Sequence, residues 1–245
     1  MIGYLLPLLP LAGLLLAAAA PAPTVRVVAE DGRTVTDCAS AEELRAHAER
    51  AASEIAALVG GSATKTVRLV IDPSRRVPYT EDPVADGSIT IRLPAARLDP
   101  ANVAGSRLAL HHELTHAIAP GAPGMDRLLV EGLAVWVEDR IGIANYPDFE
   151  LTPAAATRQL EAELGLSIPL AESERARMER PFGDERRLAY AQQGAFAGWL
   201  IERFGLPRFL AFYRKGGDWR EGFGASLDEL EREWRKALAA VPLKG

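Results

Sequence analysis

The chain has 245 residues, a formal net charge of −5 and a single cysteine. One cysteine excludes an intrachain disulfide, and positive and negative charges are interspersed, without a basic stripe that would neutralise nucleic-acid phosphates. We therefore expect no nucleic-acid partner, and a fold stabilised either by packing alone or by packing together with a metal ion.

The first 22 residues carry no charged side chain and include an apolar run over residues 11–20. This composition predicts a secretory signal peptide over residues 1–22, with cleavage near Ala19. No Lys or Arg precedes the run, and residues 2–20 are just long enough to cross a bilayer, so an uncleaved anchor is the alternative. The sequence thus predicts a secreted or cell-envelope protein that contacts membrane only if this segment is retained.

The remaining residues, 23–245, have the length of a single domain. A short hairpin is predicted from strands at 24–28 and 33–36, around the turn Asp31-Gly32. Ser40 and Glu43 form a capping box for a helix to about residue 58, and a strand follows at 65–71. This β-α-β order predicts a mixed sheet backed by the helix, in an α/β lobe covering about residues 23–119.

Residues 72–87 are rich in Pro, Asp and Arg and are predicted as a loop. Residues 88–93 then alternate strictly between polar and apolar side chains, which indicates a strand with one polar face. Because this strand directly precedes the motif described next, it could form the sheet edge available to an extended peptide. An ordinary half-exposed strand explains the pattern equally well.

The most informative motif is His112-Glu113-Leu114-Thr115-His116, preceded by His111. It lies on a helix predicted to begin near Asp99-Pro100 and to end before Pro120. Its spacing places His112 and His116 on one helical face, with Glu113 beside them. We expect the two imidazoles to bind zinc and Glu113 to act on bound water.

A second helix is predicted over residues 125–141, and Glu131-Gly132 interrupts its apolar surface near the start; that surface consists of Leu128, Leu129, Leu133, Val135, Trp136 and Val137. A carboxylate within such a surface normally needs a partner, and Zn²⁺ would supply one. Three ligands, His112, His116 and Glu131, would leave a fourth position open for water, as in catalytic zinc sites. We expect Gly132 to let the two helices approach closely.

The C-terminal part, from about residue 120 to 245, is predicted to be all-helical. Residues 142–184 contain four prolines around one short helix near 155–164, which could wall a cleft. Helices are predicted at 185–204, at 207–213 and, after a Ser226–Glu229 capping box, at 227–240. Residues 175–187 mix both charges and are predicted to be a solvated surface. The expected fold class is therefore α+β, with the metal between two lobes.

With Glu131-Gly132-Leu133-Ala134 after it, the His-Glu motif resembles the zincin metallopeptidases of the gluzincin (clan MA) type, especially their short peptidase-MA-like domains. The resemblance implies a zincin-like fold, one zinc per chain held by His112, His116 and Glu131, Glu113 as general base and acid, and a peptide or protein substrate. It also points to Tyr190 as a donor to the tetrahedral oxyanion. Val135 occupies the place where some relatives carry an acidic residue supporting a ligand histidine, which leaves that support unassigned.

The leading hypothesis from the sequence is an exported zinc-dependent metallopeptidase. A catalytically inactive peptidase-like binding module is the alternative, and a chance match of the motif within an envelope interaction protein is a third possibility. His111, about 100° from His112 around the helix, is expected to face away from the metal, and His47 to lie at a surface or interface.

Overall fold

The structure is a computed structural model and describes residues 24–29, 39–60, 66–81, 87–94, 110–141, 151–179 and 183–243. The predicted leader, the second strand of the expected hairpin and the expected helix start near Asp99 lie outside these residues, as does the side chain of Ser40. No helix in the described ranges is long and apolar enough to cross a membrane. All described strands precede residue 95 and the described elements after it are helices, so the fold is α+β, as expected.

The sheet contains β1 (Val25–Ala29), β2 (Val67–Asp72), β3 (Tyr79–Thr80) and β4 (Ile89–Pro94), in the order β1-β2-β4-β3. β1, β2 and β4 run parallel, and β3 is antiparallel to β4. The parallel pairing of β1 with β2 requires a crossover, which α1 (Ala39–Val59) provides. The predicted mixed sheet with a β-α-β start is confirmed.

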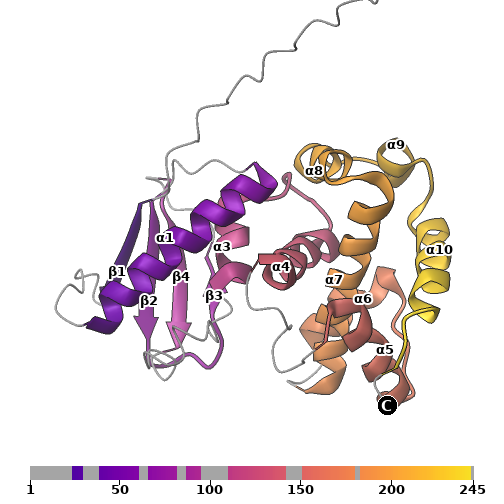
Figure 1. Cartoon of the computed structure of the whole chain (residues 1–245), viewed down its shortest axis with the longest axis horizontal. Coiled ribbons are helices and arrows are strands. Elements are labelled where there is room, and N and C mark those ends of the chain that lie inside the picture. The colour runs from indigo at the N-terminus through magenta and orange to yellow at the C-terminus, as the bar shows by residue number, and fades with distance from the viewer. Residues whose placement is uncertain are drawn as a thin grey trace, which may run out of the picture.

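Helix α1 lies along the sheet (Figure 1). Its buried face consists of small and branched apolar side chains spaced three or four residues apart, namely Leu44, Ala48, Ala51, Ala52, Ile55 and Val59. This stripe joins the inward side chains of the strands in one hydrophobic core. The helical periodicity of the sequence therefore identified the face that covers the sheet.

The expectation that β4 forms the sheet edge is wrong. β3, a two-residue strand within the segment predicted as a loop, pairs with β4 through Tyr79–Arg92 and Thr80–Ile91. Thr90, on the face expected to be polar, is buried. The proline-rich sequence around β3 hid the strand, because two residues are too few to establish an alternating pattern.

Eight described helices follow the sheet. They are α3 (Leu110–Ile118), α4 (Arg127–Ile141), α5 (Pro153–Leu164), α6 (Leu170–Glu179), α7 (Asp184–Phe204), α8 (Leu206–Lys215), α9 (Trp219–Phe223) and α10 (Leu227–Ala239). The Ser226–Glu229 capping box of α10 is present as predicted. Helices α6 and α9 were not predicted. The buried positions of α6 are Leu170, Ser173, Ala176 and Arg177, a stripe too polar to be recognised as an amphipathic helix.

Helix α7 lies at the centre of the helical lobe, with α4 on one side and α5 and α6 on another (Figure 1). Glycines permit the close contact between α4 and α7. A Cβ added at Gly132 would lie 2.6 Å from the backbone oxygen of Gln193, and one at Gly194 would lie 2.2 Å from Val135 Cγ1. Gly132 therefore brings α4 against α7, not against the motif helix α3 as the sequence suggested.

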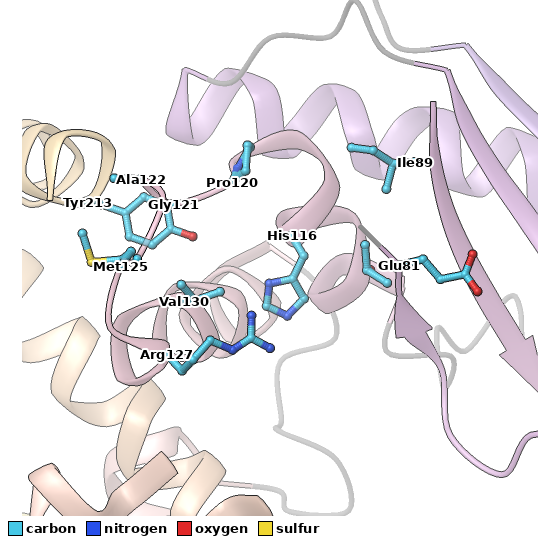
Figure 2. Close-up of a pocket in the computed structure, with 12 residues that line it drawn as sticks. Glu81, Ile89, His116, Pro120, Gly121, Ala122, Met125, Arg127, Val130 and Tyr213 are labelled. Carbon is cyan, nitrogen blue, oxygen red and sulfur yellow. The ribbon is translucent and has the colours of Figure 1, made fainter. Parts of the chain in front are cut away.

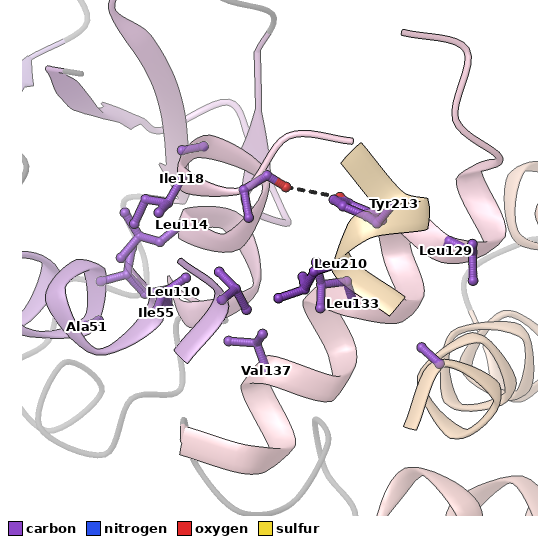
Figure 3. Packing of buried hydrophobic residues seen from close by; sticks show 14 of the residues in the cluster. Ala51, Ile55, Leu110, Leu114, Ile118, Leu129, Leu133, Val137, Leu210 and Tyr213 are labelled. Carbon is purple, nitrogen blue, oxygen red and sulfur yellow. Dashed lines mark hydrogen bonds between the residues drawn. The ribbon is translucent and has the colours of Figure 1, made fainter. Parts of the chain in front are cut away.

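The two lobes share one hydrophobic core. On its sheet side, Leu114 and Ile118 of α3 pack near Ile55 of α1, and Leu133 and Tyr213 continue the cluster into the helical lobe (Figure 3). The Tyr213 hydroxyl donates to the carbonyl oxygen of Ala119 at 3.0 Å, which ties α8 to the end of α3. Because apolar contacts run through both lobes, α3 and α4 are held between them as parts of a common core.

Candidate metal centre

Helix α3 has two different faces. Leu110, Leu114 and Ala117 are buried in the core and anchor the helix. His112 and His116 project from the opposite side, one turn apart, with ring centroids 4.9 Å apart and ring planes at 82°. The predicted division of the helix into an anchoring face and a face that presents imidazoles is confirmed.

Helix α4 brings Glu131 to these imidazoles. Glu131 Oε2 lies 3.2 Å from His112 Nε2 and 3.6 Å from His116 Nε2. One ligand atom from each of the three side chains lies within 4.8 Å of the others, and no other such group occurs in the described part of the chain. Tetrahedral zinc ligands about 2.1 Å from an ion stand roughly 3.4 Å apart, and both distances to Glu131 Oε2 are close to this value, so the two imidazoles and the carboxylate are a donor set that could hold zinc. The structure thus brings together the three predicted metal ligands.

Burial and mutual hydrogen bonding shape the charges of this cluster. Burial by itself lowers the pKa of His112, but hydrogen bonds to Glu131 and Glu138 raise that pKa well above 6.5. Burial by itself raises the pKa of Glu131, whereas hydrogen bonds from His112 and His116 hold it well below 4.5. A cation is therefore favoured at this point, and a metal ion would have to displace the proton of His112.

Glu138 supports His112 from the outer side. Its Oε2 lies 3.6 Å from His112 Nδ1, the ring nitrogen that does not face Glu131. A carboxylate beside the second nitrogen of a ligand histidine orients the ring and raises its basicity. Sequence reasoning looked for this support at Val135 and missed Glu138. The signal was present, because Glu131 and Glu138 are seven residues apart and share one helical face.

Glu113 is buried next to the candidate ligand His112, on the side of α3 that faces the sheet strand β3. Thr80 of β3 donates a hydrogen bond to Glu113 Oε2 at 2.7 Å, and the same hydroxyl lies 3.0 Å from the Glu113 carbonyl oxygen. Thr80 was not identified from the sequence, since it belongs to a segment predicted as a loop. This hydrogen bond holds Glu113 Oε2, so Oε1 is the oxygen left for the proton exchange predicted for Glu113.

Tyr190 of α7 lies beside His112, with ring centroids 6.1 Å apart in an edge-on arrangement. Its hydroxyl accepts a hydrogen bond from Arg177 Nη1 at 2.9 Å. Arg177 itself is buried, so the prediction of a solvated surface for residues 175–187 is wrong at this position. The structure therefore places Tyr190 near the candidate metal ligand His112, together with a buried arginine that sequence reasoning missed.

The other two histidines, His47 and His111, lie away from the group formed by His112, His116 and Glu131. His111 is buried against α1, where its ring stacks edge-on with that of half-buried His47 at 5.7 Å, and its Nε2 lies 3.6 Å from Glu54 Oε2. Burial is the main cause that lowers the pKa of both imidazoles. His111 therefore faces α1 and away from the candidate metal ligands, as its helical angle predicted.

A cavity of about 430 Å³ opens beside His116. Its lining comes from the sheet lobe at Thr80, Glu81 and Ile89, and from the connection between α3 and α4 together with Arg127 and Tyr213. Figure 2 shows the His116 imidazole and the Arg127 guanidinium close together in this space. The group formed by His112, His116 and Glu131 thus borders, at His116, a space large enough for part of a small peptide.

No protein-family model matches the chain, and no curated protein matches its sequence significantly. The fold class and the geometry of the candidate site are therefore taken from the structure of this chain alone.

Proposed function

We propose that this chain is an exported, zinc-dependent metallopeptidase of gluzincin type. The observation that carries the proposal is the combination of His112, His116 and Glu131 in one cluster with Glu113 buried on the same helix. A zinc ion bound by these three residues would supply Lewis-acid chemistry and lower the pKa of a water to about 7. The His112-Glu113-Leu114-Thr115-His116 spacing and the cavity beside His116 support the same assignment.

In this proposal Glu113 is the general base and acid. Its carboxylate accepts a proton from the attacking water and then gives that proton to the leaving amine of the cleaved amide bond. Thr80 holds Glu113 Oε2, so Oε1 is the oxygen proposed to exchange the proton. Glu113 stands outside the three-residue ligand group, which is consistent with a carboxylate that works beside the metal.

Tyr190 is proposed to stabilise the tetrahedral oxyanion through its hydroxyl. Among the described residues, Tyr213 lines the cavity beside His116, but its hydroxyl donates to the Ala119 carbonyl oxygen. The hydrogen bond from Arg177 instead uses an acceptor position of the Tyr190 oxygen. The position of Tyr190 beside His112, with ring centroids 6.1 Å apart, is therefore the ground for proposing this role.

The test is Glu113→Gln, which keeps the size of the side chain and removes its basicity. We expect about one zinc per chain, measured by elemental analysis, and a loss of about 10²–10⁴-fold in hydrolysis of quenched fluorescent peptides. Glu172→Gln is the matched control, since Glu172 is exposed on α6 and pairs only with Arg175 among the described ion pairs. Hydrolysis by Glu113→Gln at the wild-type rate would contradict the proposed mechanism.

A further inference from the structure

One oxygen of the Glu131 carboxylate faces histidines and the other faces arginines. Oε2 faces the imidazoles of His112 and His116, whereas Oε1 lies 3.1 Å from Arg127 Nη2 and 3.5 Å from Arg177 Nη2. Glu131 is nearly fully buried, and a buried carboxylate without partners is costly. The arginines therefore satisfy the oxygen that does not face the imidazoles, and they fix the carboxylate in an orientation with its other oxygen turned toward the histidines.

The two arginines differ in how firmly they are held. The Arg127 side chain is 56% exposed and lies one turn before Glu131 on the same helix, a kind of ion pair that contributes little. The Arg177 side chain is only 7% exposed and comes from α6, in a different part of the lobe. A buried guanidinium on a separate element constrains the carboxylate from outside its own helix, so Arg177 is the stronger constraint.

The guanidinium of Arg177 is itself fixed on three sides. Its Nε and Nη2 donate to the two oxygens of Glu174, each at 2.8 Å, and its Nη1 donates to the Tyr190 hydroxyl at 2.9 Å. The planar fork of arginine suits such simultaneous contacts, which the point charge of lysine does not reproduce. Arg177 thus connects Glu131 of α4 with Tyr190 of α7.

We propose that Arg177 is a positioning residue of the proposed zinc site: it holds the Glu131 carboxylate with one oxygen turned toward the histidines and keeps Tyr190 beside them. This inference rests on the proposed zinc site and adds a residue to it. Two opposing effects have to be weighed. A cation near zinc repels it, but Glu174 pairs with Arg177 through both carboxylate oxygens and offsets its charge. We therefore expect the gain in zinc affinity from orienting Glu131 to exceed the loss from repulsion between Arg177 and the ion. Loss of Arg177 should then weaken zinc binding.

The experiment measures zinc affinity of the full chain by competition with a chelating dye. Arg177→Met and Arg177→Lys are both expected to bind zinc about 10–100-fold more weakly than wild type. Arg175→Met is the matched control, because Arg175 lies one half-turn away on the same helix, is exposed and pairs with Glu172. If repulsion dominated, Arg177→Met would bind zinc more tightly, which would overturn the inference, as would unchanged affinity in both variants.

Cobalt provides a second readout that general destabilisation would not change. The visible absorption of the Co²⁺-loaded protein reports ligand geometry, and it is expected to shift in Arg177→Lys and to remain unchanged in Arg175→Met. Arg177→Lys keeps the charge beside Glu174, so it serves as the test if Arg177→Met fails to fold. If the wild-type protein binds no zinc, both the proposed function and this inference are overturned. If the wild type binds zinc and the Arg177 variants keep its zinc affinity and Co²⁺ spectrum, this inference alone is overturned.

Discussion

On the sheet side of the metal centre, one neutral hydroxyl, that of Thr80, contacts the predicted base Glu113. On the helical side, Glu131 lies among two histidines and two arginines, and the buried one of these arginines, Arg177, is joined to Glu174 and Tyr190. The sheet side also borders the cavity beside His116. For the proposed zinc site, this difference predicts that the groups around Glu131 set zinc affinity, whereas Thr80 and the cavity serve proton transfer and access to substrate.

The largest expected effect is the loss of a ligand on the helical side. Glu131→Gln removes the anionic ligand and is expected to reduce zinc to near zero after dialysis, as elemental analysis would show. Glu138→Gln keeps all three ligands and should weaken zinc binding by about 10–100-fold, because it only loosens His112. Full zinc content in Glu131→Gln would contradict the role of Glu131 as a zinc ligand.

A change on the sheet side should affect turnover and leave the metal in place. Thr80→Val removes the hydroxyl at nearly constant volume, and a hydrogen bond to a charged group contributes about 1.5–3 kcal/mol. We therefore expect the rate of peptide hydrolysis to fall by roughly 10-fold or more, with unchanged zinc affinity. Thr80→Ser retains the hydroxyl and should keep most of the activity. Weakened zinc binding in Thr80→Val would show that the two sides are not separable.

The close contact between α4 and α7 can be tested with a single methyl group. Gly132→Ala places a Cβ 2.6 Å from the Gln193 backbone oxygen, and overpacking of this kind costs about 1–3 kcal/mol, more than the ~0.5–1 kcal/mol gained from helix propensity. The melting temperature should fall, and zinc affinity with it, because Glu131 is the preceding residue. Gly198→Ala, whose Cβ meets only the Trp136 ring edge at 3.1 Å, is the matched control and should be close to neutral.

The smallest effect expected is a pH dependence of the metal-free protein. The pKa of His112 is raised from 6.5, so its contribution to stability is complete below pH 6.5 and is lost as pH rises through the raised pKa. The pKa of Glu131 is lowered from 4.5, so its contribution is complete above pH 4.5 and is lost as pH falls through the lowered pKa. Between these values the pair stabilises the fold most.

Melting temperatures of chelator-treated wild type and His112→Ala, measured across this range, test the pH dependence. The difference between the two proteins should be most favourable to wild type between pH 4.5 and 6.5 and should shrink on both sides. A difference independent of pH would show that burial, and not the His112–Glu131 pair, dominates at the centre.

Much of the candidate site could be predicted from local spacing. Four-residue spacing places His112 and His116 on one face, and Glu131 was identified as a carboxylate out of place in an apolar helix. Glu138, Thr80 and Arg177 were missed for different reasons. Glu138 lies on the right face but beyond the expected position, Thr80 is on a strand too short to show a pattern, and Arg177 is in a stretch whose charges suggested solvent.

The sequence by itself determined the elements whose side chains repeat with a helical or strand period: the β-α-β start, the two-faced motif helix and the capped helix α10. These depend on contacts within a few residues, so their signals are local. Only the tertiary structure decided that β3 completes the sheet edge, that Gly132 faces α7, and that Arg177 reaches Glu131. Such contacts join segments far apart in the chain, and whether a charged side chain is solvated or buried depends on the partner that packing brings to it.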